Sequence, residues 1–210
     1  MKKILLSTML CLTLNFAATV DEGMSYYIKR DYEKAYSIFE ELALKNDSSA
    51  QFALGAMYYE GKGVKQDYLK AKEWYEKAAN QGHPSAQFNL GVFYKNGHGV
   101  KQDYLKAKEW YEKAAIQGYS DAQNNLGLMY DKGQGVKQDY LKAKEWYEKA
   151  AIKGYSDAQV NLGVMYYNGQ GVNVDKFKTY ELLLKAAKQG NSDAQRNLDI
   201  VCKQSPWACK

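Results

Sequence analysis

The chain of 210 residues is 46% hydrophobic and 25% charged, and it contains only two prolines. Such a composition is typical of an ordered globular protein and excludes a disordered or collagen-like chain. The formal net charge is +5, and without Lys2 and Lys3, which we expect to be removed, it is 5 − 2 = +3. Because the remaining lysines are interleaved with glutamates, we expect no nucleic-acid binding.

Residues 1–18 have the layout of a secretory signal peptide. Lys2 and Lys3 are basic, residues 4–16 are mostly apolar, and Ala17 and Ala18 are small residues of the kind found at cleavage sites. We therefore expect a periplasmic or secreted protein that is not stably inserted in a membrane after cleavage. An uncleaved anchor is the alternative, because residues 4–20 approach the shortest membrane-spanning length.

A repeat of 36 residues fills the rest of the chain, as the spacing of Gly55, Gly91, Gly127 and Gly163 indicates. Four full units align without gaps, namely residues 49–84, 85–120, 121–156 and 157–192. Before them, residues 21–48 form an atypical shorter unit without a glycine loop, and after them residues 193–210 supply a capping helix. The ends of an array are expected to differ, because a terminal unit faces water on one side.

Each full unit is predicted to form two helices. A short first helix is followed by a G-x-G-V loop, whose glycines permit positive φ angles. Asp67 then stands at the N-cap position of the second helix, which is built from good helix formers. Gly82 lies just past that helix, where a C′ glycine ends it.

The units share the pattern A-Q-x-x-L-G-x-x-Y-x-x-G-x-G-V-x-x-D-x-x-K-A-x-x-W-Y-x-K-A-A-x-x-G, which resembles the Sel-one-like repeat family, a relative of tetratricopeptide repeats. The resemblance covers residues 49–192 fully. It implies an all-α fold, an α-solenoid in which antiparallel helix pairs coil into a right-handed superhelix, and a role in protein–protein interaction. The fourth unit departs from the pattern, because Thr179, Leu182 and Leu183 replace alanine, tryptophan and tyrosine.

The first helices vary between units in an ordered way. On a helical projection, the constant Leu54, Gly55 and Tyr58 occupy one arc, which we interpret as the packing face, and the varying positions occupy the opposite arc. We expect the varying arc to line the concave side of the solenoid and to expose a row of Phe, Tyr and Val side chains to a protein partner. The alternative is that exposed positions drift and that Phe52 and Met57 are half-buried fillers. The candidate partner-binding residues, called the variable stripe, are Phe52, Ala56, Tyr59, Glu60, Phe88, Val92, Lys95, Asn96, Asn124, Leu128, Asp131, Lys132, Val160, Val164, Tyr167 and Asn168.

Cys202 and Cys209 remain after the leader, and an even pair in an exported protein favours a disulfide. On a continuous helix residues seven apart would be about 10.5 Å apart, which is too far for a disulfide. Pro206 lies between them and should end the helix, so the chain can turn back. Two free thiols are the alternative.

Enzyme activity is not expected, although some cysteine-rich secreted members of the family that the chain resembles have been described as β-lactamases. A serine β-lactamase needs the motif S-x-x-K, and no serine of this chain has a lysine three residues later. His83 and His98 lie in different loops without a metal-binding motif, so we expect no metal and no cofactor.

The expected function is therefore that of an exported scaffold for an unidentified protein partner. A periplasmic inhibitor or immunity protein that blocks a toxic enzyme is the alternative within the same class. A secreted β-lactamase-type hydrolase is the alternative from another class. The sequence leaves the oligomeric state open.

Overall fold

The computed structural model describes residues 18–209, so the expected signal peptide lies outside the described residues except for Ala18. The described part contains α-helices and one 3-10 helix, with no strand, and forms the predicted all-α solenoid. The helices are α1 Val20–Ile28, α2 Tyr32–Leu44, α3 Ser48–Glu60, α4 Tyr68–Asn80, α5 Pro84–Asn96, α6 Tyr104–Ile116, α7 Ser120–Lys132, α8 Tyr140–Ile152, α9 Ser156–Asn168, α10 Lys176–Lys188, α11 Ser192–Gln204 and the 3-10 helix η1 Pro206–Cys209.

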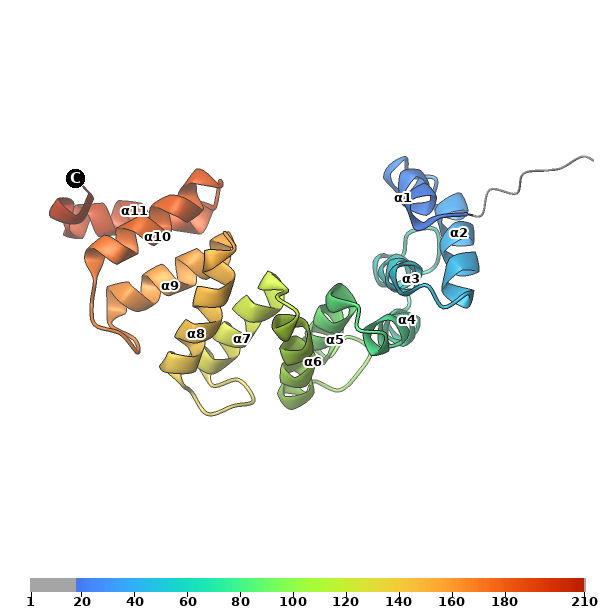
Figure 1. The fold of residues 1–210 in the computed structure, drawn as a ribbon, viewed down its shortest axis with the longest axis horizontal. Coiled ribbons are helices and arrows are strands. Elements are labelled where there is room, and N and C mark those ends of the chain that lie inside the picture. Colours follow the sequence, from blue (N-terminus) through green and yellow to red (C-terminus); the bar gives the residue numbers. More distant parts are fainter. Residues whose placement is uncertain (1–17, 210) are drawn as a thin grey trace, which may run out of the picture.

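Each helix packs against the next one along the chain, both within a unit and between units. Odd-numbered helices are the first helices of the units, and even-numbered helices are the second. Figure 1 shows the helices in chain order along an open arc, with α1–α2 and α10–α11 at its two ends. In this view α1 and α7 lie toward the inside of the arc, and α2 and α8 lie outside them.

Local sequence signals explain where the helices begin and end. The Asp67 carboxylate accepts hydrogen bonds from the backbone N–H groups of Leu69 and Lys70, at 3.0 Å each, and so caps α4. Gly61 ends α3 with φ of 69°, and Gly82 follows α4 with φ of 89°, both in the left-handed region that favours glycine. In the shorter unit at residues 21–48, Asn46 adopts φ of 68° after α2, because asparagine tolerates this region better than most residues.

Close approach of the two helices of a unit depends on a glycine beneath a buried aromatic ring. Tyr75 on α4 is 2% exposed and packs directly over Gly55 on α3. The fourth unit places the smaller Leu183 over Gly163 instead. There the Thr179 hydroxyl, which replaces an alanine, is fully buried and donates to the carbonyl oxygens of Gly163 and Asp175. The substitutions of the fourth unit therefore remain compatible with a buried helix face.

The C-terminal end is closed by the predicted disulfide between Cys202 and Cys209, whose Cα atoms are 5.6 Å apart. Helix α11 ends at Gln204, and Pro206 begins the 3-10 helix that brings Cys209 back. Ala208 is 2% exposed, so this turn is packed against the last helices.

A glutamine pair links the two helices of a unit, at the start of the first helix and the end of the second. The Oε1 atom of Gln51 accepts a hydrogen bond from Gln81 Nε2 at 2.7 Å, and the same bond is made by Gln117 to Gln87 at 2.8 Å and by Gln189 to Gln159 at 2.9 Å. In the third unit Lys153 replaces the donor glutamine, and its Nζ donates to the Gly118 carbonyl instead. The Oε1 atom of Gln123 is consequently buried without a hydrogen-bond partner among residues 18–209.

Restoring the glutamine should therefore stabilise the protein. Lys153→Gln is expected to raise the free energy of unfolding by about 1 kcal/mol, because a buried acceptor gains its donor. Urea unfolding followed by circular dichroism measures the change. The matched variant Gln117→Lys should lose a similar amount, and an unchanged midpoint for both variants would contradict this interpretation.

Candidate functional site

Four hollows lie between neighbouring first helices of the described residues, and eleven of the sixteen residues of the variable stripe line them. The first hollow lies between α1 and α3, the second between α3 and α5, the third between α7 and α9, and the fourth between α9 and α11. The stripe residues that line them are Phe52, Ala56, Tyr59, Phe88, Val92, Asn124, Leu128, Val160, Val164, Tyr167 and Asn168.

The expectation that the stripe exposes a row of large apolar side chains is wrong in its detail. Val160 is 8% exposed, and Asn124 and Asp131 are also buried. Phe52 and Phe88 are half-buried, because Phe52 packs against Tyr75 and His83, and Phe88 packs against Tyr111 and Tyr119. The apolar side chains therefore form the floors and walls of the hollows rather than a protruding patch.

Apolar side chains dominate the first and second hollows. The first hollow, of about 210 Å³, is lined by Val20 and Met24 of α1 and by Phe52 and Ala56 of α3. Phe52 is held in place by stacking on the His83 ring, with centroids 4.8 Å apart.

The second hollow, of about 160 Å³, lies between Tyr59 of α3 and Phe88 and Val92 of α5. Tyr59 packs against Phe93, and Phe88 packs against Tyr111, so both walls are fixed by aromatic contacts with ring centroids 5.5 and 5.6 Å apart.

The third hollow, of about 240 Å³, differs because most of its lining is polar. Asn124 and Leu128 of α7 form one side, and Asp157 and Asn161 of α9 lie opposite them. Asn191 and Asp193, at the start of α11, complete the lining. Two carboxylates and three amides therefore surround this hollow, which Asn124 lines at a position that is phenylalanine in the first two full units.

The fourth hollow, of about 160 Å³, is again largely apolar. Val164 and Tyr167 of α9 face Ile200 and Val201 of α11. The Tyr167 hydroxyl donates to Gln204, and the Lys176 amine lies 3.1 Å from the centre of the Tyr167 ring. These contacts fix the tyrosine at the edge of the hollow.

The other five residues of the stripe lie outside the hollows. Glu60 accepts a hydrogen bond from the Tyr27 hydroxyl at 2.7 Å and pairs with Lys62 at 2.5 Å, and these contacts lower the pKa of its carboxyl although burial opposes them. Lys95 donates to Asn125 of α7 at 3.3 Å. The remaining three are Asn96, which is exposed, and Asp131 and Lys132, which pair with each other at 3.0 Å.

Reasoning from the sequence missed a row of asparagines at the junctions between units. Asn89, Asn125, Asn161 and Asn197 stand 36 residues apart on the first helices. Asn161 donates to Asn124 of the preceding unit at 2.9 Å, and Asn89 and Asn197 line the second and fourth hollows. The constant spacing was a usable signal, but Ala53 occupies the position in the first full unit and so made it look variable.

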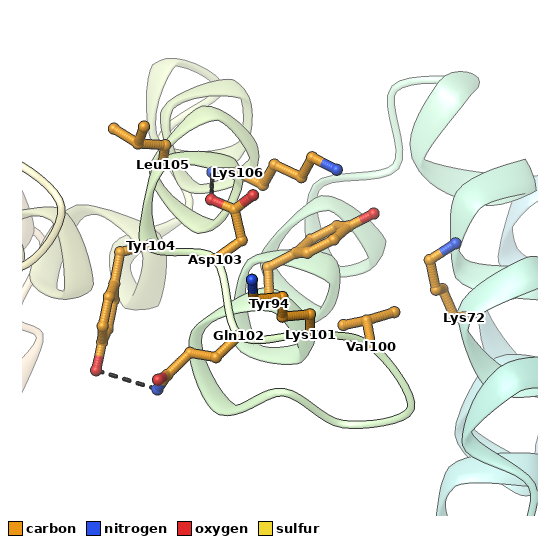
Figure 2. Close-up of a pocket in the computed structure, with 9 residues that line it drawn as sticks. All are labelled: Lys72, Tyr94, Val100, Lys101, Gln102, Asp103, Tyr104, Leu105 and Lys106. Atoms are coloured by element: carbon orange, nitrogen blue, oxygen red, sulfur yellow. Dashed lines mark hydrogen bonds between the residues drawn. The ribbon is translucent and has the colours of Figure 1, made fainter.

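A larger open hollow, of about 670 Å³, lies outside the stripe between α4 and the loop that precedes α6 (Figure 2). Figure 2 shows Lys72 facing this loop across the space, with Tyr94 and Lys106 on the other side. Lys72 pairs with Glu76 at 2.6 Å, and Asp103 caps α6 by accepting from the Lys106 backbone. Lys72 and Asp103, two charged residues of this hollow, are thus engaged in structural contacts.

The two histidines also have structural roles. His83 caps α5, because its Nδ1 accepts from the Ala86 backbone N–H at 3.3 Å, and burial lowers its pKa. His98 stacks on Tyr68 with ring centroids 5.3 Å apart. Within residues 18–209 no group of three or more His, Cys, Asp or Glu side chains could hold a metal ion, and no helix of that range is long and apolar enough to cross a membrane.

Stacked helix pairs with hollows along one helix face define an α-solenoid scaffold. The Sel1 repeat family model matches residues 21–47, 48–83, 84–119, 120–155 and 156–191, so the chain belongs to the Sel1 repeat family. Repeats of this family generally mediate protein interactions. No curated protein matches the chain.

Many solved structures are similar, and three of them show the range of the likeness. A protective antigen of uropathogenic Escherichia coli strains that displays an SLR fold is 39% identical, with a TM-score of 0.82 over 88% of this chain and 40% of its own length. A Sel1 repeat protein from Oxalobacter formigenes is 38% identical, with a TM-score of 0.81 over 86% of this chain and 74% of its own. An immunity protein from Pseudomonas aeruginosa is 25% identical, with a TM-score of 0.56 over 82% of this chain and 66% of its own. The chain thus spans less than half the length of the Escherichia coli relative.

Proposed function

We propose that the protein is an exported, non-catalytic scaffold that binds another protein through the four hollows along its first helices. The observation that carries the proposal is that eleven residues of the variable stripe, which differ from unit to unit, line these hollows. The second helices α4, α6 and α8, which are identical over their first twelve residues, build the frame, while the varying side chains give each hollow its own chemistry. A row of hollows with different linings is suited to reading successive side chains of a partner.

Export is supported by the Cys202–Cys209 disulfide, since disulfides persist in oxidising compartments. The basic and apolar leader at residues 1–18 points in the same direction. We therefore place the protein in the periplasm or outside the cell.

An immunity or inhibitor role is the second candidate, and the Pseudomonas aeruginosa structure, described as an immunity protein, favours it. In that role the partner would be an enzyme whose active site the solenoid covers. The two roles share the same binding face and differ in the effect on the partner, so an activity assay of the captured partner separates them. A secreted hydrolase is disfavoured by the missing S-x-x-K motif, and nitrocefin turnover by the purified chain would contradict our proposal.

The proposed face is tested by introducing charge into its apolar hollows. The variant Ala56→Lys/Val92→Lys/Val164→Lys changes three half-buried residues, one in each of the first, second and fourth hollows. We expect it to lose partner binding by at least about 100-fold, because lysine in an apolar contact must be desolvated. Capture from a periplasmic extract with each immobilised chain measures the loss.

Leu105→Lys supplies the matched control. Leu105 is 62% exposed on α6, away from the four hollows, so this variant should bind as well as the parent chain. Circular dichroism confirms that each variant is folded. Equal capture by the triple variant and by Leu105→Lys would refute the proposed face.

A further inference from the structure

We infer that the third hollow binds a lysine or arginine side chain of an extended partner segment, next to an apolar side chain held in the fourth hollow. This inference rests on the proposed function and adds the chemistry of the partner. It starts from the residue that occupies position 124. The equivalent residues in the two preceding units are Phe52 and Phe88, which fill the junction with the next unit. Asn124 leaves this space open.

Asn124 has an amide N–H group that makes no hydrogen bond within the described residues. The residue is 5% exposed, and its Oδ1 accepts from Asn161 at 2.9 Å. Its Nδ2 group has no hydrogen-bond partner among the described residues, although the side chain lines the hollow. Because the side chain lines the hollow, this N–H group is available to an incoming acceptor such as a peptide carbonyl.

The acceptors in the hollow outnumber the donors. The Asn161 Oδ1 receives no hydrogen bond within the described residues, because only its Nδ2 is engaged. Asp157 accepts one bond, from Asn191 Nδ2 at 2.7 Å, and forms no ion pair in the described part of the chain. These oxygen atoms can accept the N–H groups of an ammonium or a guanidinium.

The residues that line the hollow carry a net negative charge. Asp157 and Asp193 line it, and no lysine or arginine does. Asp193 pairs with Arg196, whose side chain is 76% exposed. Asp121 of the preceding unit is hydrogen-bonded by the Tyr155 hydroxyl at 2.8 Å. A basic side chain would thus meet the carboxylate of Asp157 without a competing internal cation.

The fourth hollow indicates which kind of partner side chain lies beside that basic residue. Val164 and Ile200 make the fourth hollow apolar, and α9 forms a wall of both hollows. A partner segment that lies across α9 therefore presents a basic and an apolar side chain close together. Asn124 Nδ2 donates to the backbone carbonyl of this segment and holds it in register.

The experiment selects peptides from a random 12-residue library displayed on phage, using the full mature chain as bait. The parent chain should enrich peptides in which a lysine or arginine lies within a few residues of a large apolar residue. A selected peptide and its analogue with norleucine in place of the basic residue are then compared by calorimetry. We expect the basic peptide to bind about 10-fold more tightly, as charge-assisted hydrogen bonds predict.

Two isosteric variants locate the effect. Asp157→Asn keeps an oxygen that can accept from Asn191 but removes the charge, and should bring the 10-fold preference close to 1. Asp121→Asn makes the same change one unit earlier, outside the hollow, and should leave the preference intact. Peptides enriched without a basic residue, or a preference that survives Asp157→Asn, would overturn the inference while the proposed function stands. No enrichment of any peptide would count against the proposed function and the inference together.

Discussion

Replacing Gly55 by alanine should lower the free energy of unfolding by about 3 kcal/mol, whereas the same change at Gly163 should alter it by less than about 1 kcal/mol. A Cβ atom on Gly55 would lie 2.6 Å from the Tyr75 ring, so the two helices would have to separate. On Gly163 the nearest atom is Leu183 Cγ at 3.3 Å, which a small side-chain shift relieves. Alanine also gains up to about 1 kcal/mol in helix propensity, which offsets this smaller strain.

Urea unfolding of the two variants measures the difference. The double variant Gly55→Ala/Tyr75→Leu gives the first full unit the same alanine–leucine pair that Gly163→Ala makes in the fourth, and it separates the steric clash from the loss of glycine. It should recover part of the stability that Gly55→Ala loses. Equal destabilisation at Gly55 and Gly163 would show that the aromatic ring is not the cause.

Alkaline pH should destabilise the protein steeply. Tyr75, Tyr111 and Tyr147 are buried at 2%, 0% and 1% exposure, and burial raises the pKa of each phenol well above its usual value near 10. Below about pH 10 the three phenols are neutral in both the folded and the unfolded chain, so their contribution to stability is fully present. Above it the unfolded chain ionises while the folded chain does not, so stability falls by about 1.4 kcal/mol per tyrosine and pH unit. Three tyrosines together predict a loss of about 4 kcal/mol near pH 11.

Urea unfolding at a series of pH values, with tyrosinate absorbance as a second signal, measures this slope. The variant Tyr75→Phe/Tyr111→Phe/Tyr147→Phe keeps the rings but removes the three ionisable groups, so its stability should fall much less above pH 10. The Tyr111 hydroxyl has no hydrogen-bond partner, so its removal is expected to cost little at neutral pH. A slope that is the same in the parent chain and the variant would contradict the assignment.

Much of the fold follows from short-range signals. The 36-residue period, the aspartate N-caps and the glycines with positive φ predict the helix pairs and their ends, because each depends on a few neighbouring residues. Pro206 between two cysteines likewise predicts the disulfide, since the helix has to end before the chain can turn. The constant arc of the first helix also predicts the packing face, where Leu54 is fully buried.

The candidate site was less predictable. A helical projection shows which side chains share a face, but it does not show which of them the next unit covers. Asp131 and Val160 belong to the varying arc and are nonetheless buried, and Met57 at its edge is fully buried. The asparagine row was missed for a related reason, since its interest lies in contacts between units, such as the one from Asn161 to Asn124.

The sequence by itself determined the architecture of this protein, because a solenoid is built from local signals repeated at one period. The tertiary structure decided which varying residues are open and which are covered. That outcome depends on the size of the side chain at each junction, where Phe52 fills the space that Asn124 leaves open. The varying residues therefore form a series of hollows with different linings, because each first helix packs against both its own second helix and the next unit.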